Sequence, residues 1–423
     1  MTSTTASVVA LPAGAPAAAR TVLSLLRRLR LGTLDLQLPD GQQMRFGAQR
    51  SPDAAPRTLP SAEDAKATSP HAALRVLDWE VCAAVLRSGD IGFAESFIAG
   101  HWTTPDLAAL LRLFIANRDE MESVIYGSWW GSIAYRLKHL FNRNSRRGSR
   151  RNIHAHYDLG NEFYRLWLDE TMNYSSALFD GDFACPSAQA QTAKVRRALD
   201  RCAVTPGARL LEIGCGWGAL AQEAAAGYGA RVTGVTLSTE QLAHGRERMA
   251  RHGLADRVDL RLQDYRDIDD GPYDAIASIE MFEAVGREYW DSYFQTVRRL
   301  LAPQGRACIQ TITIRDDLFA RYVRSTDFIQ QYIFPGGLLP SPQVFRAHAQ
   351  RAGLEVVQEH AFGPDYAETL RRWRADFLSR DAQVRRLGFD TRFMRIWEFY
   401  LAYCEAAFDT GNTDVMQFTL RRV

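Results

Sequence analysis

The sequence predicts an α/β protein: a doubly wound, mainly parallel sheet preceded by a smaller α+β domain. From residue 205 onward, short apolar runs alternate with helix-like stretches. Such βαβ alternation is typical of a parallel sheet with helices on both faces. A glycine-rich turn at residues 212–218 joins the first of these strands to a helix. The first 130 residues follow a different pattern, so we expect a separate N-terminal domain there.

The composition is that of a folded protein with more than one domain. A chain of 423 residues, 46% of them hydrophobic, can bury cores in about two domains. Its formal net charge of +2 gives no reason to expect a nucleic-acid partner. The six cysteines form no C-x-x-C pair and no metal-ligand spacing, so we expect a reduced cytoplasmic protein without a metal. No apolar run is long enough to span a bilayer, so we expect membrane contact to be peripheral.

The N-terminal region begins with an expected disordered tail, residues 1–20, rich in Ala, Thr and Pro. Residues 21–130 form the predicted α+β domain. Its first helix, residues 21–31, is amphipathic with interleaved arginines, and its apolar face could pack on its own domain or contact a membrane.

Two strands and a helical region follow in this domain. Residues 34–38 alternate like a strand, and residues 73–77 would add a second strand to a small sheet. Residues 51–70 are rich in Pro, Ala and Ser, which indicates a loop. The pattern then turns helical from residue 79 to residue 118.

A basic linker, residues 131–152, separates the two predicted domains. Its basic residues have no acid among them: Arg136, Lys138, Arg143, Arg146, Arg147, Arg150 and Arg151. The segment could be a solvated linker or could contact anionic phospholipid headgroups.

The second domain, residues 153–423, contains the parallel sheet. Its predicted strands are residues 209–213, 231–237, 258–262, 275–279 and 307–312. Ligands of such sheets bind beyond the carboxyl ends of the strands. The residues at those ends are Glu212 to Gly218, Thr236 to Ser238, Asp264 with Tyr265, and Ile279 with Glu280.

The glycine-rich turn indicates the ligand. Its spacing is G-x-G-x-G, which differs from the dinucleotide pattern G-x-G-x-x-G. Glu212 stands two residues before the first glycine and can accept a hydrogen bond from the ammonium of an amino-acid ligand. The turn therefore favours S-adenosylmethionine over NAD.

Several motifs together resemble those of the cyclopropane-fatty-acid synthases, in family order from about residue 150 to the end of the chain. They are His156 to Asn161, Met172 to Ser175, the glycine turn, Gly234 to Ser238 with Gln241, Met281 to Glu283, Tyr332 to Gly337, and Asp365–Tyr366 with Thr369–Leu370. Each motif alone is weak, but the set is specific. The resemblance implies a Rossmann-like class I methyltransferase sheet.

The resemblance also implies the reaction: a methyl group passes from S-adenosylmethionine to the cis double bond of an acyl chain esterified in a phospholipid. An alkene is a weak nucleophile, so catalysis depends on placement and on tolerance of a transient carbocation. Aromatic faces suit that cation. The candidates are Tyr174, Phe282, Tyr332 and Trp373. Residues 332–339, like the linker, are candidates for contact with the bilayer surface.

Family roles assign the cofactor site residue by residue. Gly214 and Gly216 should meet the methionine part, with Tyr174 and Ser175 closing over it. The ribose should lie among Thr236, Leu237 and Gln241. The adenine should lie near Asp264 and Tyr265, above Ile279.

The base site departs from the family pattern. In the family a bicarbonate ion takes the proton that ring closure releases, and a cysteine, a glutamate, a histidine and a tyrosine hold it. Glu283 and Tyr366 match two of these positions, whereas Ser176 and Gln310 replace the cysteine and the histidine. Serine and glutamine still donate hydrogen bonds, so bicarbonate can be held in an altered form.

Three interpretations stay open. The chain could be a cyclopropane synthase with a modified base site, or a methyltransferase that leaves a methyl-branched alkene without a ring. It could also be a catalytically silent protein that binds lipid and cofactor. We expect a protein peripherally associated with the inner face of the membrane; a homodimer is compatible with the sequence, which does not determine the oligomeric state.

Overall fold

The structure is a computed structural model that describes residues 14–47, 70–119 and 159–423. The predicted basic linker lies outside the described residues, as do most of the predicted tail, most of the loop at residues 51–70, and His156 to Asp158 of the first family motif. The chain divides into two compact units, and we describe each by itself.

The division between the units differs from the domains expected from the sequence. The first unit contains residues 1–135 together with residues 391–406, and the second contains residues 136–390 and 407–423. Helix α17 (Thr391–Asp409) therefore begins in the first unit, although the sequence placed it wholly in the second domain.

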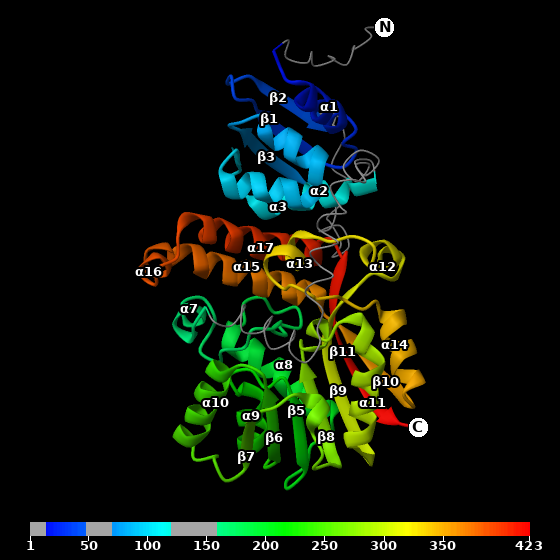
Figure 1. The fold of residues 1–423 in the computed structure, drawn as a ribbon. Helices are drawn as coiled ribbons and strands as arrows, with labels where there is room; N and C mark the ends of the chain where they lie inside the picture. The colour runs from blue at the N-terminus through cyan, green and yellow to red at the C-terminus, as the bar shows by residue number, and fades with distance from the viewer. Residues whose placement is uncertain (1–13, 48–69, 120–158) are drawn as a thin grey trace, which may run out of the picture. The chain divides into compact units, whose positions relative to one another are not determined.

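The first unit contains a four-stranded sheet in the order β2-β1-β3-β4. The strands are β1 (Thr33–Gln37), β2 (Gln43–Gly47), β3 (His71–Val76) and β4 (Trp102–Thr103). β1 runs antiparallel to β2 and parallel to β3, and the buried residues alternate along all three of these strands. Figure 1 shows α1, α2 and α3 beside this sheet. β2 was not predicted, since its run of five residues is short and polar on one face.

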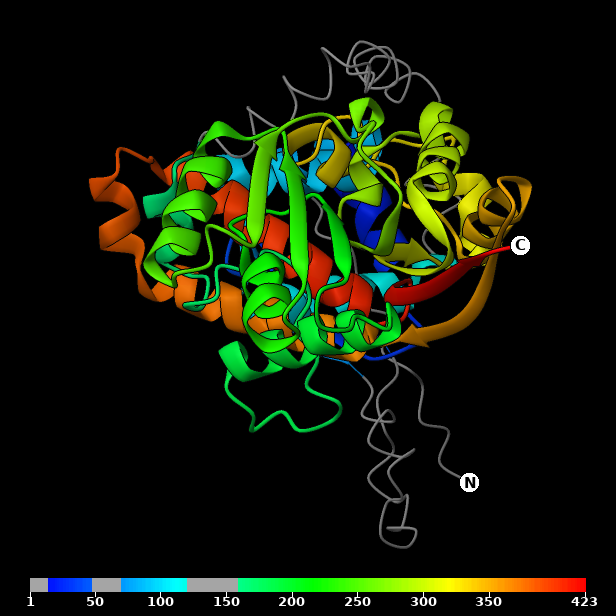
Figure 2. The same ribbon diagram turned by 90° about the horizontal axis from the view of Figure 1, so that it is seen from below.

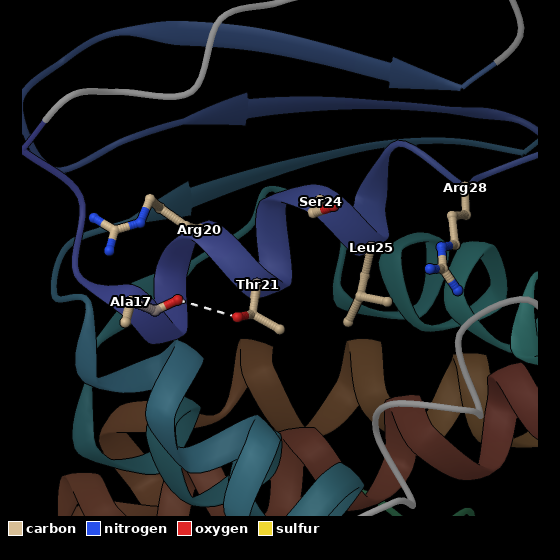
Figure 3. Close-up of a pocket in the computed structure, with 6 residues that line it drawn as sticks. All are labelled: Ala17, Arg20, Thr21, Ser24, Leu25 and Arg28. Atoms are coloured by element: carbon tan, nitrogen blue, oxygen red, sulfur yellow. Dashed lines mark hydrogen bonds between the residues drawn. The ribbon is translucent and has the colours of Figure 1, made fainter.

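Helix α1 (Ala17–Leu26) buries its apolar face within the first unit. Ala19, Leu23 and Leu26 are buried, which decides in favour of packing on its own domain. A pocket beside this helix is shown in Figure 3. It is lined by Ala17, Arg20, Thr21, Ser24, Leu25 and Arg28. The helix begins at Ala17, so residues 17–20 are part of α1 and not of the predicted tail.

The helical region of the first unit consists of α2 (Glu80–Ala99) and α3 (Leu107–Ala116). α2 is interrupted at Gly89, whose φ of 58° and ψ of −130° are not helical. α2 ends at Ala99, and the next residue, Gly100, adopts the left-handed conformation that glycine favours at this position.

The second unit contains a seven-stranded sheet in the order β10-β11-β9-β8-β5-β6-β7. The strands are β5 (Arg209–Ile213), β6 (Arg231–Thr236), β7 (Val258–Leu262), β8 (Tyr273–Ile279), β9 (Leu301–Ile314), β10 (Leu354–Ala361) and β11 (Thr413–Arg422). β5 to β9 pair in parallel, whereas β11 runs antiparallel between β9 and β10. The predicted α/β class with a mainly parallel sheet is confirmed.

Neighbouring residues of each strand point to opposite faces of this sheet, and each face carries its own core. Leu210 belongs to the core under α8 (Ser187–Arg201), α9 (Ala219–Gly227) and α10 (Thr239–Arg251). Leu211 belongs to the core under α11 (Trp290–Leu300) and α14 (Pro342–Arg351). Figures 1 and 2 show these helices on the two faces.

The remaining helices lie near one end of the sheet. α7 (Asn161–Arg165), α13 (Phe328–Tyr332) and α15 (Gly363–Ser379) are above the upper end of the strands in Figure 1. The others are α12 (Asp316–Tyr322), α16 (Asp381–Arg386) and the short 3₁₀ helices η2 (Tyr265–Asp267), η3 (Phe282–Ala284) and η4 (Arg287–Tyr289). No helix in the described part of the chain is long and apolar enough to cross a membrane.

Candidate active site

The glycine turn after β5 is shaped for close approach of a ligand. Gly214 has a φ of +85°, and a Cβ there would lie 2.9 Å from Cγ of Met281. Gly216 has a φ of +50°, and a Cβ there would meet no atom within 4 Å, so its side faces open space. Both conformations favour glycine, and the peptide N–H groups of Gly214 and Cys215 donate to the carbonyl of Val235 on β6. The turn is therefore fixed against the neighbouring strand.

Glu212, the residue before the last of β5, has a buried oxygen without a hydrogen-bond partner. The residue is 4% exposed, and its Oε2 has no hydrogen-bond partner. Burial raises the pKa of Glu212 to about 8, against the opposing charge of Lys194. A buried carboxyl oxygen without a donor costs free energy unless a ligand supplies one. The ammonium of an amino-acid ligand is such a donor.

Ser175 is held from two sides by α8. Nε2 of Gln191 donates to the Ser175 carbonyl at 2.7 Å, and Nζ of Lys194 donates to the Ser175 hydroxyl oxygen at 2.6 Å. Gln191 and Lys194 are three residues apart, so both lie on the same face of the helix. The preceding residue, Tyr174, packs in an aromatic cluster, with ring centroids 5.5 Å from that of Trp373.

The residues expected around the ribose lie together at the end of β6. Oγ1 of Thr236 donates to Oε1 of Gln241 at 2.9 Å, and the Ser238 side chain caps α10 by accepting from the Gln241 peptide N–H. Leu237, between them, is half-buried.

The residues expected near the adenine follow β7 and β8. The Asp264 carboxylate accepts from Arg266 through both oxygens, at 2.8 and 2.5 Å. The Tyr265 ring packs edge-on against Tyr293 at 5.4 Å. Ile279, the last residue of β8, is half-buried.

Glu280, immediately after β8, is the centre of the expected base site. Its Oε1 accepts from the Ser176 peptide N–H at 2.9 Å and from Nε2 of Gln310 at 2.8 Å. Its Oε2 accepts from the Tyr366 hydroxyl at 2.6 Å. Three of the residues expected to hold a bicarbonate ion therefore donate to a carboxylate of the protein itself, and these donors do not fit an added bicarbonate while Glu280 occupies them.

The backbone at Glu280 is unusual. Its φ is +48°, a left-handed conformation that costs a residue with a Cβ about 1 kcal/mol or more. Burial raises the pKa of Glu280 from its ordinary value, whereas the hydrogen bond from Tyr366 and the charge of Lys194 oppose that rise. Strain of this kind at the end of a strand is typical of functional sites.

A chain of side-chain hydrogen bonds supports Gln310 from behind. Its Oε1 accepts from Nε2 of Gln417 at 3.0 Å, and Oε1 of Gln417 accepts from Arg197 at 2.5 Å. Because the Gln310 oxygen is already occupied, its Nε2 is directed toward Glu280. Gln417 on β11 therefore orients Gln310 on β9 toward Glu280.

Glu283 lies near this carboxylate but has a different partner. Its Oε1 accepts from the Ile312 peptide N–H, and its Oε2 is buried without a partner. Burial, and then repulsion from Glu280, raise the pKa of Glu283 to about 8. Two neighbouring carboxyls do not both ionise readily. Since Glu280 has three donors, we assign the negative charge to it and the proton to Glu283.

The structure separates the four aromatic candidates for cation stabilisation. Tyr174 and Trp373 pack together, and Trp373 also approaches the Tyr366 ring at 6.3 Å. Phe282 is fully buried in the core among Trp290, Tyr293 and Phe345, away from this cluster. Tyr332 stacks on Phe328 at 5.2 Å.

Sequence reasoning thus named most of the residues that meet here but not two of the central ones. Glu280 was noted only as the end of a strand, and Lys194 was not considered. The position of Glu280 beyond the carboxyl end of β8 was the available signal. Nothing in the local sequence marks Lys194, because its role depends on where α8 packs.

A seven-stranded, mainly parallel sheet with a glycine turn and an acid at its first carboxyl end defines an S-adenosylmethionine-dependent methyltransferase. The unsatisfied Glu212 oxygen and the open side of Gly216 fit the cofactor. Residues 144–418 match the family described as mycolic acid cyclopropane synthetase, and the chain belongs to this family.

Named relatives support this assignment. The tuberculostearic acid methyltransferase UfaA1 of Mycobacterium tuberculosis is 43% identical over 343 residues, which cover 79% of this chain and 80% of that protein. The cyclopropane-fatty-acyl-phospholipid synthase of Escherichia coli K12 is 35% identical over 357 residues, which cover 84% and 89%. The crystal structure of mycolic acid cyclopropane synthase CmaA1 complexed with SAH and CTAB aligns with a TM-score of 0.61 at 35% identity, covering 64% of this chain and 98% of that one. The chain is therefore a methyltransferase that modifies fatty acids.

Proposed function

We propose that this methyltransferase installs a methyl branch on an unsaturated acyl chain and that Glu280 is its base. The observation that carries the proposal is the Glu280 carboxylate itself, which accepts from Ser176, Gln310 and Tyr366. A base built into the protein replaces the bicarbonate of the family reaction. The 43% identical relative is named a tuberculostearic acid methyltransferase, which supports the same product class.

The reaction follows from the charges at the site. The cofactor supplies an electrophilic methyl group on a sulfonium. When the alkene carbon bonds to that methyl group, the sulfur–methyl bond would break, its electron pair would stay on the sulfur of the departing thioether, and the neighbouring alkene carbon would become cationic. Glu280 stabilises the cation and then accepts a proton from an adjacent chain carbon, so that the C–H electron pair forms the new double bond. The product is a methylated alkene, and the proton ends on the carboxylate.

The cofactor contacts are part of the same proposal. Glu212 would accept from the cofactor ammonium, the glycine turn would meet its methionine part, and Thr236 with Gln241 would lie at the ribose. Tyr174 and Trp373 would line the path of the acyl chain beside Tyr366. The substrate would be a phospholipid acyl chain at a bilayer surface. The name of the 35% identical relative, cyclopropane-fatty-acyl-phospholipid synthase, supports a phospholipid acyl substrate.

Ring formation is the second candidate, favoured by the family match over residues 144–418. The two products differ in which C–H bond breaks. If Glu280 took its proton from the newly added methyl group, a cyclopropane would close. Only the position of the lost hydrogen separates the two.

The test uses unsaturated phospholipid vesicles and S-adenosylmethionine with a fully deuterated methyl group. Mass spectrometry and NMR of the released fatty acids should show a branched alkene that keeps all of the label. A saturated ring that has lost one deuterium would overturn the methyl-branching assignment.

The base is tested by Glu280→Gly. This variant leaves the donors of Ser176, Gln310 and Tyr366 without their carboxylate, so turnover should fall at least about 100-fold and added formate or bicarbonate should restore part of it. Glu280→Gln fills the space without a base and should not respond to either anion. Full activity in both variants would show that Glu280 is not the base.

A further inference from the structure

Lys194 is the one lysine of the described second unit, and the reaction as proposed does not use it. Its side chain on α8 is 0% exposed. Burying an ammonium is costly unless its charge is compensated. The hydroxyl oxygen of Ser175, at 2.6 Å, is the only hydrogen-bond acceptor that the described residues offer it. One neutral acceptor cannot compensate a buried cation, so the carboxylates around it must do so.

Three carboxyl groups from three different elements interact with the charge of this ammonium. They are Glu280 after β8, Glu212 on β5 and Asp169 in the segment that follows α7. Burial lowers the pKa of Lys194 to about 8, and these carboxylates oppose that change. Glu212 belongs to the cofactor turn and Glu280 is the proposed base. The positive charge of this ammonium therefore acts on both functional carboxyls.

A second connection runs through the backbone. Lys194 holds the side chain of Ser175, and the next peptide N–H, that of Ser176, donates to Oε1 of Glu280 at 2.9 Å. The carbonyl of Lys194 itself accepts from Gln417, whose other contacts orient Gln310. Two of the three donors to Glu280 thus depend on the segment of α8 that carries this lysine.

We propose that Lys194 is a positioning residue that joins the cofactor site to the base: it fixes Ser175 and supplies the positive charge that keeps Glu280 ionised. The inference rests on the proposed function, since it concerns the base named there. Lys194 touches neither the methyl group nor the acyl chain in this role.

The test compares Lys194→Met with Lys194→Arg by the pH dependence of single-turnover methyl transfer. In the profile of rate against pH, the rate should fall on the acidic side because the base becomes protonated. We call this falling part the acidic limb. Without the cation, Lys194→Met should move this limb upward by about one pH unit and weaken S-adenosylhomocysteine binding several-fold. Lys194→Arg keeps the charge and should keep the limb where the unaltered enzyme has it.

The control is Arg196→Gln, which removes an exposed cation on the same helix that pairs with Glu223 at the surface. It should leave both the limb and the binding constant unchanged. Melting followed by circular dichroism distinguishes loss of folded protein from loss of the proposed role. Loss of folded protein would lower the folded fraction without displacing the limb. If Lys194→Met does not fold, Lys194→Arg decides the matter: a displaced limb overturns the inference and an undisplaced one supports it.

Glu280→Gln, measured in parallel, keeps the two proposals apart. If it retains full activity, the proposed base is wrong. If it is inactive while folded Lys194→Met shows an undisplaced limb, the base stands and the role of Lys194 is wrong.

Discussion

At the scale of single residues, the chemistry concentrates in three carboxyls with different surroundings. Glu280 has three hydrogen-bond donors, Glu283 has one, and Oε2 of Glu212 has none. Burial raises the pKa of all three, and the donors decide which of them bears charge. From this difference we propose that Glu280 is the base, that Glu283 is protonated and that Glu212 binds the cofactor ammonium.

Glu212 should make cofactor binding depend on pH. In the cofactor-free protein its pKa is raised to about 8, and the ligand ammonium prefers the ionised form. Affinity for S-adenosylhomocysteine should therefore rise with pH from 6 toward 8, by up to roughly tenfold per pH unit. Calorimetric titration of the unaltered protein measures this slope.

Glu212→Gln is the comparison for that slope. It should bind more weakly at pH 8 and lose most of the pH dependence. Glu247→Gln, which removes an exposed carboxylate paired with Arg251, should retain it. An equal slope in Glu212→Gln would contradict the assignment.

At the scale of elements, the turn between β5 and α9 requires glycine at position 214 for two reasons: its left-handed backbone and its close approach to Met281. In Gly214→Ala the new Cβ would meet Met281 at 2.9 Å in addition to the left-handed strain. We expect a loss of about 3 kcal/mol in the free energy of unfolding and a large loss of S-adenosylhomocysteine binding.

Gly207→Ala is a matched control for this turn. Gly207 has a similar φ of +82°, but a Cβ there meets no atom within 4 Å. It should lose only the strain, about 1–2 kcal/mol, and bind normally. Thermal melting and calorimetry of the two variants check both numbers, and equal effects would refute the role of Met281.

The N-terminal end of α15 holds the segment that carries Ser176. Oδ2 of Asp365 accepts from the peptide N–H groups of Phe179 and Asp180, at 2.6 and 2.9 Å. Asp365→Ala leaves both without a partner, so the free energy of unfolding should fall by about 3 kcal/mol. Activity should fall too, because Ser176 and Tyr366 lose their common support. Denaturant unfolding measures the first effect.

Asp381→Ala is the corresponding control. Asp381 forms an exposed ion pair with Arg385 one turn along α16, and such pairs contribute about 0.5 kcal/mol or less. A loss in Asp365→Ala as small as in Asp381→Ala would mean that the segment is held by other contacts.

At the scale of the whole molecule, the proposed function requires access to lipid. The apolar face of α1 is buried in the first unit, so this helix cannot insert that face into a bilayer. The predicted basic linker is then the stronger candidate for attraction to anionic headgroups.

Replacing Arg146, Arg147, Arg150 and Arg151 with glutamine tests this linker. Each basic residue near an anionic surface contributes about 1 kcal/mol, so binding to anionic vesicles should weaken at least tenfold. The unaltered protein should also bind less at high salt. Co-sedimentation measures both, and the Arg20→Gln, Arg28→Gln double variant on the exposed side of α1 is the comparison. Unchanged binding in the linker variant would refute the role of the linker.

Local pattern determined the parallel part of the fold. β5 and β7 have the predicted bounds, and β6 differs by one residue at its end. Their apolar runs and the glycines between them are signals carried by neighbouring residues. β10 and β11 were not predicted, because β10 is largely exposed and β11 joins the sheet from the far end of the chain. β11 takes its place by pairing with β9, and β10 by pairing with β11, which no local pattern encodes.

The same division holds for the site. By itself the sequence determined the sheet class, the cofactor turn, the family and the departure from its base site at Ser176 and Gln310. Only the tertiary structure brought Glu280 between those residues and Tyr366, and placed Lys194 behind Ser175. The physical reason is that a turn and its glycines act within a few residues. The hydrogen bonds of Glu280 instead span separations of 30 to 104 residues. Pairing of β8 with β9 closes the one to Gln310, and packing of α8 and α15 against the sheet closes the other two.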